Sequence, residues 1–286
     1  MLLLDFLRTI YTAARLGITP GSIAQYGFAV RQFSHFLGHD ARLADLTELT
    51  VRAFLADYRA HFSASTTNVK RAELLSLWRV AVDEGLLPTL PNARKIPRLR
   101  APVPMPEAWT TEEVGRILRA ARASPGLVSG LSAAAWWESL LLVAYDTGER
   151  RGALLAARTS DLSITGWIAF VATKTGQPRH CPLSDQTLAA CRVIYDRARS
   201  LIWPWPQTRQ TFDAHLMRIL LAAGVSFGRA HGGLLHKMRK TTGTLIETNG
   251  GDGAAFIGNS RRVFEAHYLD RRFCRNDLCR LPRPTF

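Results

Sequence analysis

The sequence has few cysteines, a small share of acidic residues and no long hydrophobic run. Four cysteines among 286 residues are too few for the disulfide framework on which small secreted domains depend. No hydrophobic stretch reaches the roughly 18 residues that a membrane span requires. Asp5 and Arg8 interrupt the apolar N-terminus before the core of a signal peptide can form. We therefore expect a cytoplasmic protein with no membrane partner.

A metal site is also not expected. Cys274 and Cys279 have His267 nearby, but their spacing matches no common zinc pattern and no acidic ligands cluster there. No group of carboxylates suggests a two-metal nuclease. We therefore expect an activity that needs no metal and no cofactor.

Positive charge is in clear excess. Lys and Arg number 37 against 23 Asp and Glu, which gives a formal net charge of +14. The surplus is five in residues 1–100 and nine in residues 101–286, so it is not confined to a basic tail. Basic side chains that neutralise phosphates release condensed counterions and so gain affinity. Nucleic acid is the expected partner, although an anionic membrane surface attracts such a protein too.

Hydrophobic periodicity predicts a helical N-terminal domain over residues 1–87. The first helix begins after Thr19, with Pro20 at its first position. A second begins near Thr50 and a third near Ser65, each with apolar residues at three- and four-residue steps. The third is expected to carry the side chains that face a DNA groove: Thr66, Thr67, Asn68, Lys70 and Arg71.

Residues 88–106 predict an extended linker. This stretch holds six prolines, so it cannot be helical throughout. Its basic residues are candidates for contacts with backbone phosphates: Arg94, Lys95, Arg98 and Arg100.

The second predicted domain, residues 107–286, combines helices with one small antiparallel sheet. Thr110 and Glu113 form a capping box, and an apolar helix follows at about 132–146. Residues on either side of Lys174 to Gln177 are typical of a short hairpin. Helical patterns resume at about 185–200, 208–222, 236–248 and 260–270. The predicted fold is mainly α with a small antiparallel β-sheet.

Three local patterns in this domain bear on chemistry. Arg150 follows a Thr-Gly turn at the start of a helix, where a guanidinium is unfavourable unless an anion binds there as well. His236 and Arg239 are three residues apart and share one helix face. Tyr268 follows about 30 residues later. Taken singly, a surface arginine, a structural histidine and a packed tyrosine are the ordinary interpretations.

In this order, the motifs resemble those of the tyrosine recombinases, the phage integrase family. The matching stretches, from about residue 110 to 270, read TGERRGALLAARTSDL, TKTGQPRHCPL, HKMRKTTGTLIETNG, FIGNS and FEAHYLD. The helical domain is similar to the core-binding, SAM-like domain of that family. Five weak motifs in a fixed order are more specific than any one of them.

The resemblance implies a role for each matching residue. Arg150 is the first catalytic arginine, Lys174 the hairpin lysine, and His236 with Arg239 the paired motif. Tyr268 is the nucleophile. Lys240, next to the paired motif, is a further candidate for DNA binding. The sequence departs from the family at two positions. Asn259 stands where His or Trp is usual, and Ala153 stands where Glu or Asp is usual.

The implied function is site-specific cleavage and rejoining of double-stranded DNA. Attack of a tyrosine oxygen on a phosphodiester builds negative charge, which two arginines stabilise. A 3′-phosphotyrosyl link keeps the bond energy, so neither ATP nor metal is needed. The family implies a homotetramer on two recombination sites, in the cytoplasm at the nucleoid. Two alternatives stay open: a DNA-binding relic with weak or no cleavage, and a monomeric enzyme like a type IB topoisomerase.

Overall fold

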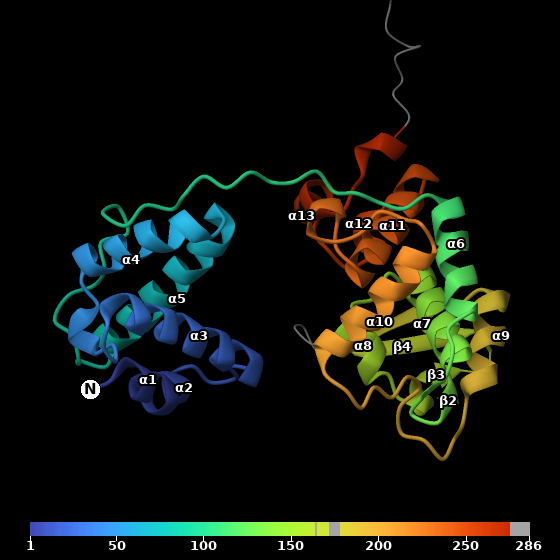
Figure 1. The fold of residues 1–286 in the computed structure, drawn as a ribbon, viewed down its shortest axis with the longest axis horizontal. Helices are drawn as coiled ribbons and strands as arrows, with labels where there is room; N and C mark the ends of the chain where they lie inside the picture. Colours follow the sequence, from blue (N-terminus) through green and yellow to red (C-terminus); the bar gives the residue numbers. More distant parts are fainter. Residues whose placement is uncertain (164, 172–177, 275–286) are drawn as a thin grey trace, which may run out of the picture. The chain divides into compact units, whose positions relative to one another are not determined.

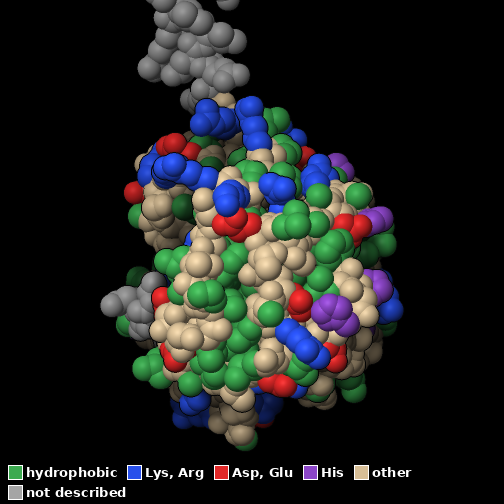
Figure 2. Space-filling view, turned by 90° about the vertical axis from the view of Figure 1, so that its left-hand side faces the viewer, with side chains coloured by type: hydrophobic (Ala, Val, Ile, Leu, Met, Phe, Trp, Pro, Cys, Tyr) green, Lys and Arg blue, Asp and Glu red, His purple; other side chains and the backbone are tan. Residues whose placement is uncertain are grey.

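The chain divides into two compact units, Met1–Pro102 and Val103–Phe286. The computed structural model describes residues 1–163, 165–171 and 178–274 (Figure 1). None of the helices within these ranges is long and apolar enough to span a membrane. Lys and Arg side chains gather near the upper edge of the face in Figure 2, whereas hydrophobic side chains are common over its middle.

The first unit is helical. Its three longer helices confirm the predicted ones: α3 (Pro20–Leu37), α4 (Glu48–His61) and α5 (Ala64–Asp83). Each begins at a hydroxyl cap, from Thr19, Thr47 and Ser63 in turn, which accepts a backbone N–H of the first turn. The N-terminus was not predicted to be helical, yet it forms α1 (Leu3–Phe6), η1 (Leu7–Tyr11) and α2 (Thr12–Ala14). A short turn, η2 (Leu43–Asp45), precedes α4.

Aromatic rings fill the core of this unit. The rings of Phe33 and Phe36 pack edge-on against Phe54, and Tyr58 lies beside Phe54 with ring centroids 5.5 Å apart. The N-terminal segment contributes Phe6 and Tyr11 to the same core. The segment is helical because this burial stabilises its short, poorly capped turns.

Much of the predicted linker packs against the first unit. Asn68 donates to the carbonyl of Leu99 at 2.8 Å and accepts its N–H at 2.9 Å. The Arg71 guanidinium donates to the carbonyl of Ile96, whose side chain is buried. Residues 88–102 lack helix, as their prolines require. The division between the units, after Pro102, lies within the expected linker of residues 88–106.

The second unit has one helix at its centre, surrounded by others. The helices are α6 (Thr111–Arg122), α7 (Ala133–Thr147), α8 (Arg151–Ala156), α9 (Asp185–Ile194), α10 (Arg209–Ala222), α11 (Leu235–Thr248), α12 (Gly253–Phe256) and α13 (Arg261–His267), with single turns η3 (Thr159–Asp161), η4 (Arg229–His231) and η5 (Arg271–Phe273). α7 packs against α6, α9 and α11. Its Trp136, Trp137 and Leu140 are fully buried, so α7 is the hydrophobic axis of the unit.

A three-stranded antiparallel sheet lies beside these helices. Its strand order is β3 (Leu162–Ser163), β4 (Trp167–Val171) and β5 (Pro178–Pro182). Ile168 of β4 lies opposite Cys181 of β5, and both are buried in the core. A smaller hairpin pairs β1 (Leu127–Val128) with β2 (Leu131–Ser132). The predicted fold class, mainly α with a small antiparallel sheet, is confirmed.

Candidate active site

The turn between α7 and α8 presents Arg150. Gly148 ends α7 with φ of 61°, a left-handed conformation that glycine adopts without strain. A Cβ at Gly148 would lie 3.1 Å from the Ile257 side chain, so the turn also needs a small residue here. Arg150 precedes α8 in an extended conformation with an exposed side chain. The guanidinium therefore stands at the start of a helix, where an anion is favoured.

Arg239 is buried on α11 and holds two distant segments. Its side chain is 1% exposed. Nη1 donates to the Gly148 carbonyl at 2.6 Å, and Nη2 donates to the carbonyl of Ile257. Nε has no hydrogen-bond partner among the described residues. A buried donor left unpaired costs free energy, so this N–H is available to a ligand oxygen.

Tyr268 lies between the two side chains of the paired motif. It follows α13 directly and is 8% exposed. Its ring centroid is 5.4 Å from that of His236, in an edge-on arrangement, and 5.5 Å from Cζ of Arg239. Thr244 of α11 donates to the Tyr268 carbonyl at 3.1 Å. The structure thus brings together His236, Arg239 and Tyr268, which are up to 32 positions apart in the sequence.

His236 lies in positively charged surroundings. The residue keeps an exposed surface, while part of its side chain is buried. This partial burial, with the positive charges of Lys240, Arg239 and Arg150, lowers the pKa of His236 to about 4. Burial and then the charge of Arg150 also lower the pKa of Arg239. These mutual effects place Arg150 and Lys240 within electrostatic reach of the pair.

Two sites of departure from the family differ in their surroundings. Asn259 is half-buried, and its amide Nδ2 is enclosed with no partner in the described part of the chain. It is therefore a second buried donor, after Arg239 Nε, without an acceptor among the described residues. Ala153, on α8, offers no polar group at its position. Lys174 lies outside the described residues.

Sequence reasoning missed Arg179 of β5. This arginine donates to Glu149 Oε1 at 2.6 Å and to the Thr147 carbonyl at 2.9 Å. It also donates to the Phe256 carbonyl, and its guanidinium lies 5.1 Å from the centre of that ring. The basic character of the stretch QPRHCPL was visible in the sequence, but nothing local indicated partners 32 and 77 residues away.

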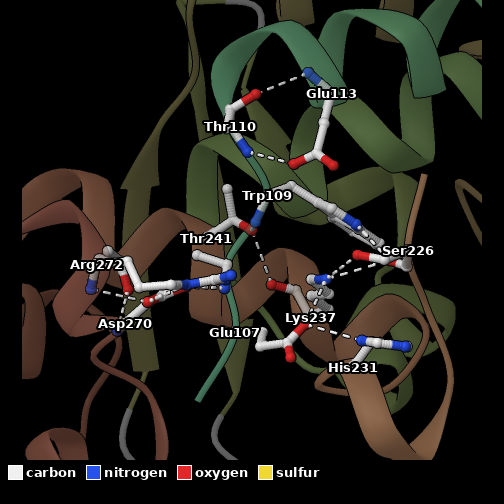
Figure 3. A network of polar contacts seen from close by, with 12 residues as sticks. Glu107, Trp109, Thr110, Glu113, Ser226, His231, Lys237, Thr241, Asp270 and Arg272 are labelled. Carbon is white, nitrogen blue, oxygen red and sulfur yellow. Dashed lines mark hydrogen bonds and ion pairs between the residues drawn. The ribbon is translucent and has the colours of Figure 1, made fainter. Parts of the chain in front are cut away.

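A polar network holds the start of the second unit to α11 (Figure 3). The N–H of Trp109 donates to Thr241 Oγ1 at 2.9 Å. The N–H of Ala108 donates to the Asp270 carboxylate at 2.8 Å. Buried Lys237 lies 3.4 Å from Glu107, and burial lowers the pKa of Lys237. Residues 107–109 are therefore held to α11, the helix that carries His236 and Arg239, and to Asp270.

The predicted DNA contacts of the first unit fall into two groups. Arg94, Lys95, Arg98 and Arg100 are exposed, although Lys95 pairs with Glu48 at 2.8 Å. On α5, Thr66 is half-buried, Thr67 and Lys70 are buried, and Asn68 and Arg71 bind residues 93–99. Lys70 is paired with Glu73 at 2.7 Å. The exposed group is thus better placed for phosphate contacts, which stay a prediction.

The described residues contain no group of three or more His, Cys, Asp or Glu side chains that could hold a metal ion. What they do contain is a set of cations and donors around a tyrosine. Such a set stabilises the charge of a phosphate oxygen.

Two family models match this chain. Residues 108–255 match the Phage integrase family, and residues 7–85 match the Phage integrase N-terminal SAM-like domain. The first match ends before Asn259 and Tyr268.

Individual relatives and structures give the same result. The chain is 25% identical to the integrase of Enterobacteria phage 434 over 273 residues, which cover 91% of this chain and 73% of that protein. It is 29% identical to tyrosine recombinase XerD of Caulobacter vibrioides over 176 residues, 60% of this chain and 55% of that one. A lambda integrase dimer bound to a COC′ core site has the same fold, with a TM-score of 0.73, 23% identity and coverage of 94% and 77%. A lambda integrase tetramer bound to a Holliday junction has a TM-score of 0.72, 24% identity and coverage of 94% and 77%. The chain therefore belongs to the phage integrase family.

Proposed function

We propose that this protein is a site-specific recombinase that cleaves and rejoins double-stranded DNA through a 3′-phosphotyrosyl intermediate. The observation that carries the proposal is the position of Tyr268, whose ring contacts His236 and lies against the guanidinium of Arg239. A tyrosine buried for packing alone would not need two phosphate-binding groups of this kind beside it.

In the proposed reaction, the Tyr268 hydroxyl oxygen attacks the phosphorus of the scissile phosphodiester. The new bond joins tyrosine to the 3′ phosphate, and the bond to the 5′ oxygen breaks. Neutral His236 takes the phenolic proton, and Lys174 delivers a proton to the departing 5′ oxygen. A 5′ hydroxyl then attacks the phosphotyrosine and reverses these steps, so the strand is rejoined without an external energy source.

The surrounding donors determine where the phosphate sits. Arg150 is exposed at the start of α8, and Arg239 Nε and Asn259 Nδ2 are buried with no hydrogen-bond partner among the described residues. Phosphate oxygens would satisfy these N–H groups, which explains why the fold tolerates their burial. Arg150 binds as a charged fork, while Arg239 is held in place by the carbonyls of Gly148 and Ile257.

The partners proposed for the chain are a DNA duplex and three further copies of itself on two recombination sites. The lambda integrase structures hold a core site or a Holliday junction, and the basic surplus of both halves supports binding to phosphates. Mixing two recombination sites with the protein and counting subunits by native mass spectrometry tests this assembly.

A nicked suicide substrate tests the chemistry. The bound sequence is first selected from random duplexes, and the winner is then nicked close to the cleavage position so that rejoining is prevented. We expect a covalent protein–DNA adduct that survives denaturation and is absent from Tyr268→Phe. A verified binding site on which the wild-type protein forms no adduct would exclude the proposed reaction.

A DNA-binding relic with weak cleavage is the second candidate, favoured by Ala153 and Asn259. Asparagine donates a hydrogen bond but carries no positive charge. Asn259→His alone, and together with Ala153→Glu, should raise the adduct rate about tenfold if the site is merely weakened. No adduct from either variant, with binding intact, would favour the relic. A plasmid relaxation assay separates the topoisomerase-like alternative, because a recombinase needs two sites.

A further inference from the structure

Two arginines from different elements donate hydrogen bonds to the same two segments, residues 147–148 and 256–257. Arg239 of α11 donates to the carbonyls of Gly148 and Ile257. Arg179 of β5 donates to the carbonyls of Thr147 and Phe256. Each guanidinium thus binds one carbonyl from the turn before Arg150 and one from the end of α12. In both segments, the carbonyl that Arg239 binds lies one residue after the carbonyl that Arg179 binds.

Arg179 also reaches Arg150 through Glu149. Oε1 of Glu149 accepts from Arg179 at 2.6 Å, while Oε2 accepts the backbone N–H of Arg150 at 3.0 Å. The Glu149 side chain is only 9% exposed. A carboxylate with both oxygens engaged in charge-assisted contacts has little freedom, so it fixes the backbone from which the Arg150 side chain extends.

We propose that Arg179, through Glu149, is the positioning residue that orients Arg150 in this protein. The inference rests on the proposed function and goes beyond it, because it assigns a role to a residue outside the motifs. It also accounts for Ala153, which supplies no carboxylate on α8. The carboxylate that fixes this part of the site comes instead from the preceding turn, and the cation that fixes the carboxylate comes from the sheet.

Arg179 acts on a further part of the site as well. Its contact with Phe256 ties β5 to the end of α12, three residues before Asn259. The turn before Arg150 and the end of α12 are therefore joined through one guanidinium, and a displacement of about 1 Å at such groups costs on the order of 100-fold in rate.

Adduct formation by Arg179→Met under single-turnover conditions, with DNA saturated, tests the proposal. Methionine keeps the packing volume over Phe256 but supplies no donor. We expect the rate to fall about 10- to 100-fold, and Arg179→Lys to fall less, because lysine keeps the ion pair with Glu149 but cannot also reach two carbonyls. Glu149→Gln should also lower the rate, since the amide offers one acceptor oxygen to two N–H donors, Arg179 and the Arg150 backbone.

Arg151→Met is the matched control. Arg151 has the same 22% side-chain exposure as Arg179 and pairs with Asp213 at 2.9 Å. Its guanidinium lies 5.4 Å from the Phe212 ring, close to the 5.1 Å between Arg179 and Phe256. It therefore loses the same kinds of interaction, but none that reaches the carbonyls of residues 147 or 256. We expect Arg151→Met to lower the urea midpoint less than Arg179→Met, because it frees no carbonyl, and to stay within about threefold of the wild-type rate.

A methylphosphonate at the scissile position provides the readout that a purely structural role would not move. Replacing one nonbridging oxygen by a methyl group removes a negative charge, so a misplaced Arg150 matters less in the transition state. The rate defect of Arg179→Met should shrink at least fivefold on this substrate, as should that of Arg150→Ala. An equal defect on both substrates, or a wild-type rate on the ordinary one, would overturn the assignment. If wild type itself forms no adduct on either, the proposed function fails instead.

Discussion

Helices α5 and α11 make the same two kinds of contact, but we assign them different roles. Each has a buried lysine facing a glutamate: Lys70 with Glu73, and Lys237 with Glu107. Each also has an arginine that donates to carbonyls of remote segments: Arg71 to residues 93 and 96, and Arg239 to residues 148 and 257. Both helices therefore look equally basic in sequence, although their cations are largely engaged within the protein.

The two helices differ in which of their buried polar atoms lacks a hydrogen-bond partner among the described residues. Among the described residues, the buried side-chain atom of α5 without a partner is Glu73 Oε1, an acceptor with negative charge. At α11 it is Arg239 Nε, a donor with positive charge. A phosphate is repelled by the first and attracted by the second. Whether a basic helix serves as scaffold or as binding site is thus decided by its tertiary partners rather than by its count of basic residues.

Removing the donor at α11 should have the largest effect. Arg239→Ala deletes the contacts to the Gly148 and Ile257 carbonyls and the free Nε, so we expect adduct formation to fall at least about 1,000-fold. Arg239→Lys should be nearly as slow, because an ammonium cannot hold two carbonyls and a phosphate together. Single-turnover adduct assays at saturating DNA measure this. A loss of less than tenfold would remove the distinction between the helices.

Breaking the ion pair at α5 should act on stability. Lys70→Met leaves Glu73 charged and buried, which costs about 3–5 kcal/mol in the free energy of unfolding. The double variant Lys70→Met with Glu73→Leu should regain most of this loss, because no charge is then left without a partner. Urea denaturation followed by far-UV circular dichroism measures both. Equal stability of the single and double variants would show that the pair is not buried as described.

Releasing the carbonyls held by α5 should have a milder effect. Arg71→Ala removes the donor from the carbonyls of Ala93, which is exposed, and Ile96, which is buried, so we expect a loss of about 1–3 kcal/mol. Residues 88–102 should then be cut by trypsin or chymotrypsin sooner than in the wild-type protein. Unchanged proteolysis would indicate that Ile96 and its neighbours, rather than Arg71, hold this segment.

Titration of His236 should affect stability only below about pH 6.5. Because the pKa of His236 is about 4 in the folded protein and about 6.5 in an unfolded chain, the unfolded state binds more protons between these values. The free energy of unfolding therefore falls as the pH drops from about 6.5 to 4. This decrease should be smaller in His236→Gln, as measured by urea denaturation at pH 7 and pH 5. An NMR midpoint for His236 near 6.5 would contradict the lowered pKa.

Periodicity and capping chemistry account for most of the fold. Thr19 with Pro20, and Thr110 with Glu113, mark helix starts that the structure confirms. These signals are local, within about four residues, and so can be read in one dimension. The N-terminal helical turns escaped prediction because burial of Phe6 and Tyr11 in the core, rather than a cap, stabilises them.

The site was predictable only in part, for the same reason. His236 and Arg239 share a helix face by their spacing, and their order with Tyr268 matched a known pattern. The partners of Arg179 and Lys70 could not be read in this way. Arg179 meets residues from two other segments, and Lys70 is buried beneath Phe28 of another helix, so neither burial nor partners follow from neighbouring residues.

The hydrogen bonds that hold Tyr268 bear on whether two defective copies of the protein can complement each other in strand cleavage. Thr244 of α11 donates to the Tyr268 carbonyl and accepts the Asp270 N–H, while Asp270 binds the N–H of Ala108 in the same unit. Tyr268 and Arg239, the proposed nucleophile and the proposed phosphate ligand, thus lie together in one polypeptide. Mixing the Tyr268→Phe and Arg239→Ala proteins should therefore not restore strand cleavage, because neither copy can lend the other its missing half.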